Sequence, residues 1–179
     1  MFHLDIPNAG DFPVIENLLD ICFGPDRLRK ISYRYRDGVP DEADLRRVAR
    51  LNGRLVGTII YTPILIGSDR GLLLGPVAVC PTLRGRKIGQ TLIWQSLLLA
   101  QQKGHARVIL VGDETYYKQF GFQLAAKFGI TMPGEPDRLM ALALQPGGFE
   151  GNSGPVLPAF KTPGQHQQAN DHDHRQPSR

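Results

Sequence analysis

A basic segment at residues 81–90, PTLRGRKIGQ, contains the residue types that bind a phosphate group. It connects the apolar run LLLGPVAV to a segment with helical periodicity. Where a strand leads into a helix, unpaired backbone N–H groups point outward and the positive end of the helix dipole lies behind them. A glycine lets a phosphate approach closely, and Arg84, Arg86 and Lys87 add positive charge. The segment therefore predicts a pyrophosphate site, with plain basic surface as the alternative.

A second segment whose side chains could take part in a reaction is VGDETYYKQFGF, residues 111–122. Its pattern predicts the end of a strand, a turn at Gly112 and Asp113, and a short helix. A phenol with a pKa of about 10 is protonated at neutral pH and can deliver a proton through a hydrogen bond. Because consecutive helical residues project about 100° apart, Tyr116 and Tyr117 cannot serve one role. Aromatic packing is the alternative role for either tyrosine.

Other reactive side chains are placed less favourably. Cys80 follows the apolar run, but a covalent acyl-cysteine route needs a paired histidine that the sequence does not place nearby. We expect a buried structural thiol there instead. His166, His172 and His174 lie in a polar segment with no fixed geometry and predict a solvated tail. No metal is therefore expected.

The elements that position these segments follow from hydrophobic periodicity. Residues 72–79 are apolar on both faces, as in a central strand, and Pro81 ends that strand. Residues 88–103 repeat apolar and small side chains at helical spacing, which predicts a helix with one buried face. A strand over 107–111 completes a strand–helix–strand unit with a right-handed crossover.

Residues 41–53, DEADLRRVARLNG, have two interpretations. Helical propensity favours a helix that ends at Gly53. The Asn-Gly pair between apolar runs favours a hairpin with strands over 45–51 and 55–66, and we predict the hairpin. The remaining predicted elements are helices between Asp11 and Gly24, over 27–36 and over 115–120, and strands near 122–128 and 139–144. This order predicts an α+β, or mixed α/β, fold.

Composition excludes several classes of protein. The chain has 179 residues, of which 41% are hydrophobic and 21% charged, which excludes a fully disordered chain, a coiled coil and a collagen-like fibre. The net charge of +4 is too small to argue for nucleic-acid binding. No acidic residue lies between Asp69 and Asp113, and this basic stretch suits an anionic small ligand or a solvated basic face.

The chain is predicted to form one domain over residues 1–146, with a C-terminal extension over 147–160 and a disordered polar tail over 161–179. Two cysteines and the lack of a signal-like or membrane-length apolar run predict a cytoplasmic protein without membrane partners. A homodimer stays open, because the patch at 156–160 can pack on its own core or on a partner.

The order of strand, R-G-R-K-I-G loop, helix, strand and Y-K-Q-F-G-F resembles the GCN5-related N-acetyltransferase (GNAT) superfamily over roughly residues 10–150. The family signature is a [QR]-x-x-G-x-[GA] loop followed by a Y-x-x-x-G-F-like segment. Each motif is weak alone, and the two in this order are fairly specific. The longer sequence, including PGEPDRLMALAL, also resembles an uncharacterised bacterial branch of this superfamily. The resemblance implies a central, mixed, mostly antiparallel sheet flanked by helices, with a V-shaped splay between its two central parallel strands.

The resemblance also implies which residues contact acetyl-CoA. The end of the central strand would pair its backbone with the pantetheine arm, and an N–H group near Val79 would bind the oxyanion. Arg84 matches the [QR] position and Gly89 the final [GA]. Tyr117 matches the later tyrosine and is implied as the proton donor to the leaving thiolate. The residues implied to bind the cofactor are Val77, Ala78, Val79, Arg84, Gly85, Arg86, Lys87, Ile88, Gly89, Gln90 and Asp113.

One departure concerns Lys87, which replaces the middle glycine of the motif. A positive φ at this position would cost a lysine about 1–2 kcal/mol. Helical backbone angles would cost little and leave an extra charge for phosphate. Because 88–103 already has helical periodicity, we expect helical angles at Lys87.

The function implied by the resemblance is an acetyl-CoA-dependent N-acetyltransferase that moves the acetyl group directly to a primary amine. The general base is open among Asp26, Glu42, Asp113, Glu114 and a water relay, because the central strand carries no glutamate. A non-catalytic acyl-CoA-binding or regulatory protein is the alternative. A nucleic-acid-binding module lacks a supporting motif. The acceptor pocket is expected among Arg27, Arg29, Lys30, Tyr33, Tyr35, Glu135 and Asp137.

Overall fold

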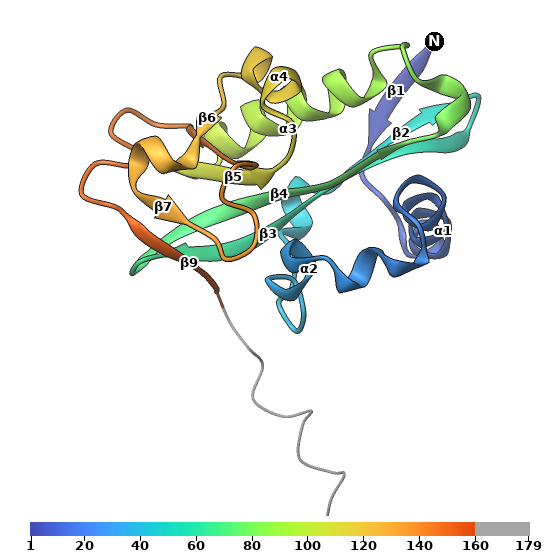
Figure 1. Cartoon of the computed structure of the whole chain (residues 1–179). Coiled ribbons are helices and arrows are strands. Elements are labelled where there is room, and N and C mark those ends of the chain that lie inside the picture. The colour runs from blue at the N-terminus through green and yellow to red at the C-terminus, as the bar shows by residue number, and fades with distance from the viewer. Residues whose placement is uncertain (160–179) are drawn as a thin grey trace, which may run out of the picture.

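Two long antiparallel strands, β3 (Arg54–Ile66) and β4 (Asp69–Val79), form the centre of the sheet (Figure 1). The computed structural model describes residues 1–159, so the predicted polar tail lies outside the described residues. The strand order is β1 (Phe2–Asp5), β2 (Arg47–Leu51), β3, β4, β5 (Arg107–Val111), β8 (Leu139–Ala143) and β6 (Gln123–Leu124). Only β4 and β5 are parallel along this path, so the sheet is mostly antiparallel, as predicted.

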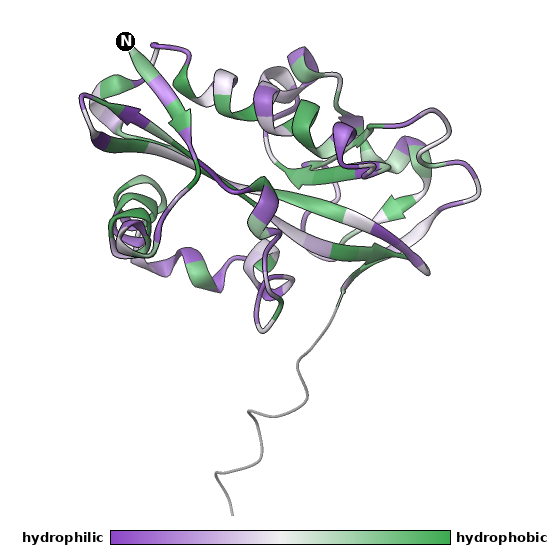
Figure 2. Cartoon of the chain, turned by 180° about the vertical axis from the view of Figure 1, so that it is seen from behind, coloured by the Kyte–Doolittle hydropathy of each residue, from purple (hydrophilic) through white to green (hydrophobic). Residues whose placement is uncertain are grey.

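Helices cover both faces of the sheet (Figure 1). On one face lie α1 (Phe12–Phe23), η2 (Pro25–Arg29) and α2 (Ile31–Arg34). On the other lie α3 (Ile88–Gln102) and α4 (Glu114–Tyr117). Figure 2 shows the central strands as mostly hydrophobic, with hydrophilic patches on helices and turns. The short 3-10 turns are η1 (Ala9–Asp11), η3 (Ala43–Leu45), η4 (Pro81–Leu83), η5 (Lys118–Phe120) and η6 (Ala125–Phe128).

The two parallel strands separate along their length. They pair only at Leu72 with Val108 and at Leu73 with Ile109, after which β4 continues alone on that side to Val79. A register shift against β3 falls at Gly75 and Pro76, which lie between the partners of Tyr61 and Ile59. The predicted V-shaped splay is therefore present, and among residues 1–159 no strand pairs with this edge of β4 beyond Leu73.

The hairpin prediction is confirmed, and the Asn52-Gly53 turn joins β2 to β3 with positive φ at both residues. The helix predicted over 27–36 is wrong as a single element. Lys30 is extended (φ −65°, ψ 144°) and divides it into η2 and α2. The guanidinium of Arg27 is buried against α1, which fixes η2 before α2 begins.

The late part of the chain also departs from the prediction. The strand expected near 122–128 is only β6, because η6 follows it at once and buries Ala125. The C-terminal patch packs on the chain's own core, since Val156 in β9 (Gly154–Pro158) is buried and β9 pairs with β3 and with β7 (Ile130–Thr131). Across the described residues, no helix is long and apolar enough to cross a membrane.

Candidate active site

The predicted phosphate loop joins β4 to α3. After η4, Arg84, Gly85, Arg86 and Lys87 are all exposed, and α3 begins at Ile88. The first backbone bond into the helix runs from the N–H of Thr91 to the carbonyl of Lys87 at 2.9 Å. The N–H groups of the three helical residues before Thr91 therefore lie N-terminal to that bond and are available to an anion.

Lys87 does not have the predicted helical angles. It caps α3 with φ 61° and ψ 11°, in the left-handed region. The prediction was wrong because the chain must reverse its hand between the extended Arg84 and the helix, and the glycine of the family motif serves that need. The lysine thus carries a backbone penalty of about 1–2 kcal/mol relative to a right-handed residue.

A hollow of about 500 Å³ lies over the loop, which we call the loop hollow. Seven predicted cofactor-binding residues line it, together with Leu83 and Tyr116. They are Val79, Arg84, Gly85, Lys87, Ile88, Gly89 and Gln90. Of the other four, Val77 and Asp113 line a second hollow, Ala78 is buried against α1, and Arg86 is exposed beside the loop.

Basic charge is concentrated at this loop rather than along the whole acid-free stretch. Lys103 pairs with Asp44 at 2.9 Å, and Arg107 pairs with Asp69 at 3.1 Å. Both cations are therefore already neutralised. Arg84, Arg86 and Lys87 are three exposed cations of this stretch that lie together at the loop, where they can attract an anion.

The unpaired edge of β4 points backbone groups into the splay. The N–H of Cys80 donates to the carbonyl of Val56 at 2.8 Å, which fixes the alternation of the ladder against β3. The backbone N–H and C=O groups of successive β4 residues point alternately toward β3 and away from it. Those of Ala78 point toward β3, and those of Val77 and Val79 point toward the open edge. The Sγ of Cys22 donates to the carbonyl of Val79 at 3.4 Å. An extended ligand can therefore add to this edge mainly through Val77 and the N–H of Val79.

The second hollow, of about 250 Å³, lies where the two parallel strands separate, and we call it the splay hollow. It collects residues from α1 to the segment before β8. Its lining residues are Phe23, Lys30, Ser32, Tyr33, Arg36, Leu74, Gly75, Pro76, Val77, Val111, Gly112, Asp113, Tyr117, Glu135 and Arg138. Charged side chains of both signs therefore line one concave site, and a few converging polar groups are typical of ligand-binding pockets.

Tyr117 is half-buried in the splay hollow, and Tyr116 lines the loop hollow. The two tyrosines therefore face different sites, as their spacing predicted. Burial, followed by the neighbouring Tyr116, raises the pKa of Tyr117 to about 12. Its ring packs edge-on against Tyr116 and Phe122. A Cβ atom on Gly112 would lie 2.7 Å from its Cδ2, so only glycine admits the ring in this position.

The carboxylates nearest to this chemistry are Asp113 and Glu135. Asp113 caps α4, accepting the Tyr116 N–H at 2.8 Å. Glu135 is half-buried and lies 3.8 Å from the Nη1 of Arg138. Asp26 lies on the surface beside Arg29, and the splay hollow does not include Glu42 or Glu114. Of these two lining carboxylates, Asp113 is held by its capping bond, whereas Glu135 makes the longer ion pair with Arg138.

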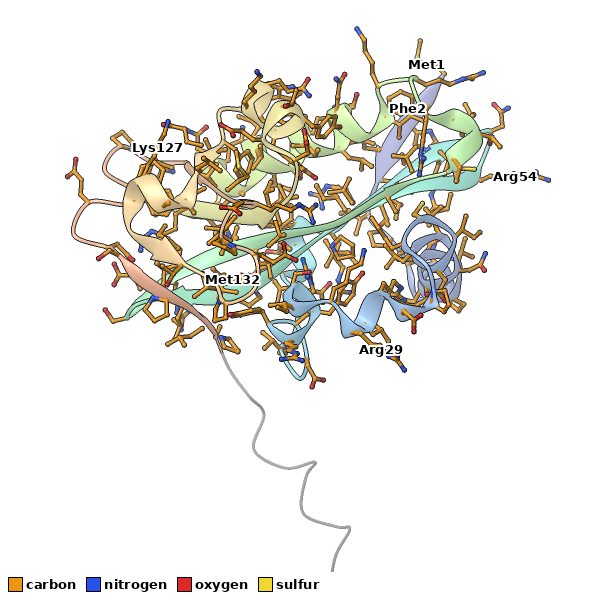
Figure 3. All side chains as sticks on the ribbon, in the orientation of Figure 1. Met1, Phe2, Arg29, Arg54, Lys127 and Met132 are labelled. Atoms are coloured by element: carbon orange, nitrogen blue, oxygen red, sulfur yellow. The ribbon has the colours of Figure 1, made fainter. Side chains whose placement is uncertain are left out.

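Only some of the residues predicted to form the acceptor pocket line the splay hollow. Lys30, Tyr33 and Glu135 line the splay hollow. Arg27 is buried in ion pairs with Glu16 and Asp20, Tyr35 is in the core, and Arg29 projects outward (Figure 3). Asp137 lies outside the lining.

Two charged residues of the splay hollow, Arg36 and Arg138, were not predicted as site residues. Each is one charge in a mixed-charge segment, and no periodicity distinguishes it.

The other reactive side chains do not form a centre of their own. Cys80 is half-buried, and its Sγ lies 3.3 Å from the hydroxyl of Thr82. Among residues 1–159, no group of three or more His, Cys, Asp and Glu side chains is placed to hold a metal ion. The three tail histidines lie outside the described residues.

The fold and the two adjoining hollows define the class of protein. Residues 12–122 match the acetyltransferase (GNAT) family, and the chain belongs to this family. The predicted family and fold class are thereby confirmed.

The relatives include the protein YhbS of Escherichia coli strain K12, named an uncharacterised N-acetyltransferase. It is 32% identical over 120 residues, which cover 65% of this chain and 70% of YhbS. A crystal structure of E. coli YhbS in complex with CoA superposes with a TM-score of 0.73 at 27% identity and 87% coverage of both chains. A GNAT family acetyltransferase from Brucella melitensis, in complex with acetyl-CoA, gives a TM-score of 0.65 at 26% identity and covers 88% of this chain and 95% of that chain.

Proposed function

We propose that this chain transfers the acetyl group of acetyl-CoA directly to a primary amine. The carrying observation is the open edge of β4, which runs from the splay hollow, at Val77, to the loop hollow, at Val79. A ligand with a pyrophosphate at one end and a thioester at the other matches this order of sites. CoA and acetyl-CoA in the two related structures support the same assignment.

Binding of the pyrophosphate falls to the loop. The free N–H groups at the start of α3 donate to its oxygens, and Arg84, Arg86 and Lys87 supply opposite charge. The pantetheine amides pair with the backbone of Val77 and Val79, which have no strand partner on that side. Ala78 contributes no such bond, because its backbone groups face β3.

The transfer step takes place in the splay hollow. The amine nitrogen attacks the thioester carbonyl carbon, and the backbone N–H of Val77 or Val79 that the pantetheine arm leaves unused stabilises the oxyanion. The C–S bond then breaks, and Tyr117 gives its phenolic proton to the departing thiolate. Glu135 accepts the proton that the amine loses, directly or through water. Both substrates are held together, so no acetylated enzyme forms.

Tyr117 suits the role of proton donor because its site keeps it protonated. The raised pKa of about 12 keeps the phenol neutral at physiological pH. Gly112 and the aromatic neighbours fix the ring.

A non-catalytic acyl-CoA-binding protein on the same fold is the second candidate. Two departures from the family pattern favour it: Lys87 stands where the motif has a glycine, and β4 carries no glutamate. Turnover separates the two candidates. Purified protein is incubated with acetyl-CoA and a panel of primary amines, and free thiol is measured. Amine-dependent release of CoA supports the enzyme. Saturable acetyl-CoA binding with no release from any amine supports the binding protein.

A further inference from the structure

Arg36 is a cation in the splay hollow without an acidic partner. It is half-buried at the end of α2 and lines the hollow beside Gly75. Within the described residues its guanidinium makes hydrogen bonds only to backbone carbonyls, those of Gly75 and Ser32. Burial lowers the pKa of Arg36 to about 10. A positive charge held in this environment favours an anion that the chain itself does not supply.

The carbonyl bonds leave part of the guanidinium unused. Nε and Nη2 donate to the carbonyl of Gly75 at 3.1 and 2.8 Å, and Nη1 donates to the carbonyl of Ser32 at 2.8 Å. A guanidinium has five N–H donors, so one donor on Nη1 and one on Nη2 remain. These two N–H groups lie on the two terminal nitrogens, and each can donate to an oxygen of a carboxylate.

Other residues hold the guanidinium in place. Its Cζ lies 5.2 Å from the centre of the Tyr33 ring, and the Cζ of Arg27 lies 5.6 Å from the same centre. Arg27 is fixed by Glu16 and Asp20 of α1. Arg36 is therefore oriented before any ligand arrives, which lowers the entropy lost on binding.

The charged residues that line the splay hollow also favour an anionic ligand at Arg36. Its cations are Lys30, Arg36 and Arg138, and its carboxylates are Asp113 and Glu135. Asp113 is used as a helix cap, and Glu135 lies beside Arg138. Lys30 places its Nζ over the ring of Phe23 at 5.6 Å. Arg36 is thus the cation that lies against the β4 backbone at Gly75 while the carboxylates are engaged elsewhere.

We propose that the acceptor is a small amine carrying a carboxylate, which Arg36 binds through its two unused N–H groups. This proposal rests on the proposed acetyl transfer. The carboxylate of such a compound lies against Arg36, and its amine reaches toward Tyr117 and Glu135, which line the same hollow. A hollow of about 250 Å³ suits a single amino acid or a compound of similar size.

The test compares amino acids with their carboxamides. The amide keeps the shape of the acid and removes its charge. With the wild-type chain and saturating acetyl-CoA, we expect kcat/KM for at least one acid to exceed that of its amide by about tenfold or more, because a charge-assisted bidentate pair is lost. Amides accepted as well as their acids would overturn the proposal and leave acetyl transfer standing.

Variants test whether Arg36 causes the preference for the acid over its amide. In Arg36→Met the ratio of kcat/KM for the acid to that for the amide falls toward one, mainly because KM for the acid rises. Arg34→Met removes the same charge from an exposed position of α2 and keeps the wild-type ratio. Equal loss of acid and amide turnover in Arg36→Met would reduce Arg36 to a brace for Gly75 and overturn the proposal.

Acetyl-CoA binding is measured by calorimetry on every variant. It separates failure of this proposal from failure of the proposed function. Binding of acetyl-CoA without acetylation of any acid in the panel overturns the carboxylate acceptor. Absence of acetyl-CoA binding in the wild-type chain overturns acetyl transfer itself.

Discussion

The loop hollow and the splay hollow are built in different ways. The loop hollow is formed mostly by residues 79–90, one continuous segment, and its anion-binding groups are the backbone N–H donors and basic side chains of that segment. The splay hollow draws on residues from Phe23 to Arg138, and its polar groups are side chains. Under the proposed function, binding of acetyl-CoA is therefore a local property of the chain, and selection of the acceptor depends on how distant segments pack.

This difference predicts separable defects. Changes in the loop hollow should weaken acetyl-CoA binding with little effect on kcat. Changes in the splay hollow should reduce turnover and leave acetyl-CoA binding nearly intact.

The largest expected effect is that of Tyr117→Phe. Loss of the proton donor should lower kcat about 100-fold or more, with the Kd for acetyl-CoA unchanged. Tyr35→Phe removes the hydroxyl of a buried tyrosine outside both hollows and serves as the matched control. Kinetics of CoA release and calorimetry measure the two quantities. An unchanged kcat in Tyr117→Phe would remove Tyr117 from the mechanism.

Arg84→Met should give the opposite pattern. Loss of one charge that faces the pyrophosphate should raise the Kd for acetyl-CoA about tenfold, with kcat at saturation retained. The control is Arg54→Met, because Arg54 projects into solvent at the β2–β3 turn (Figure 3). Titrations at low and high salt measure both variants. The difference between them should shrink at high salt, and equal affinities at low salt would contradict a phosphate role for Arg84.

Lys87→Gly tests the backbone of the loop. Relief of the left-handed lysine should raise the free energy of unfolding by about 1 kcal/mol, as measured by denaturant titration. The same substitution at Lys118, which has right-handed angles (φ −58°, ψ −27°), should lower that free energy. If Lys87→Gly lowers it as well, the left-handed conformation is not strained.

The smallest effect is expected from alkaline pH. Tyr117 loses the proton it donates only as pH rises through its raised pKa of about 12. An ordinary phenol is half-ionised at pH of about 10. We therefore expect kcat to stay nearly constant between pH 8.5 and pH of about 10. A decline of kcat by half across this interval, in a chain that circular dichroism shows to be folded, would show that burial does not raise the pKa of Tyr117.

The contrast between the hollows also explains what the sequence predicted. Asn52-Gly53 specifies a turn locally, so the hairpin was found, and the basic loop before α3 was found for the same reason. The angles of Lys87 depend on how the strand meets the helix, and propensity could not supply them. Arg36 acquires its place only because α2 packs near the register shift of β4, which no spacing in the sequence encodes.

Calorimetric titration of the wild-type chain with acetyl-CoA, with ATP as the control, tests the central claim most directly. The account predicts saturable binding of acetyl-CoA with a Kd of about micromolar order and much weaker binding of ATP, because the β4 edge selects the pantetheine arm. Absence of acetyl-CoA binding, or equal binding of ATP, would contradict the assignment of the open β4 edge and its loop as a coenzyme A site.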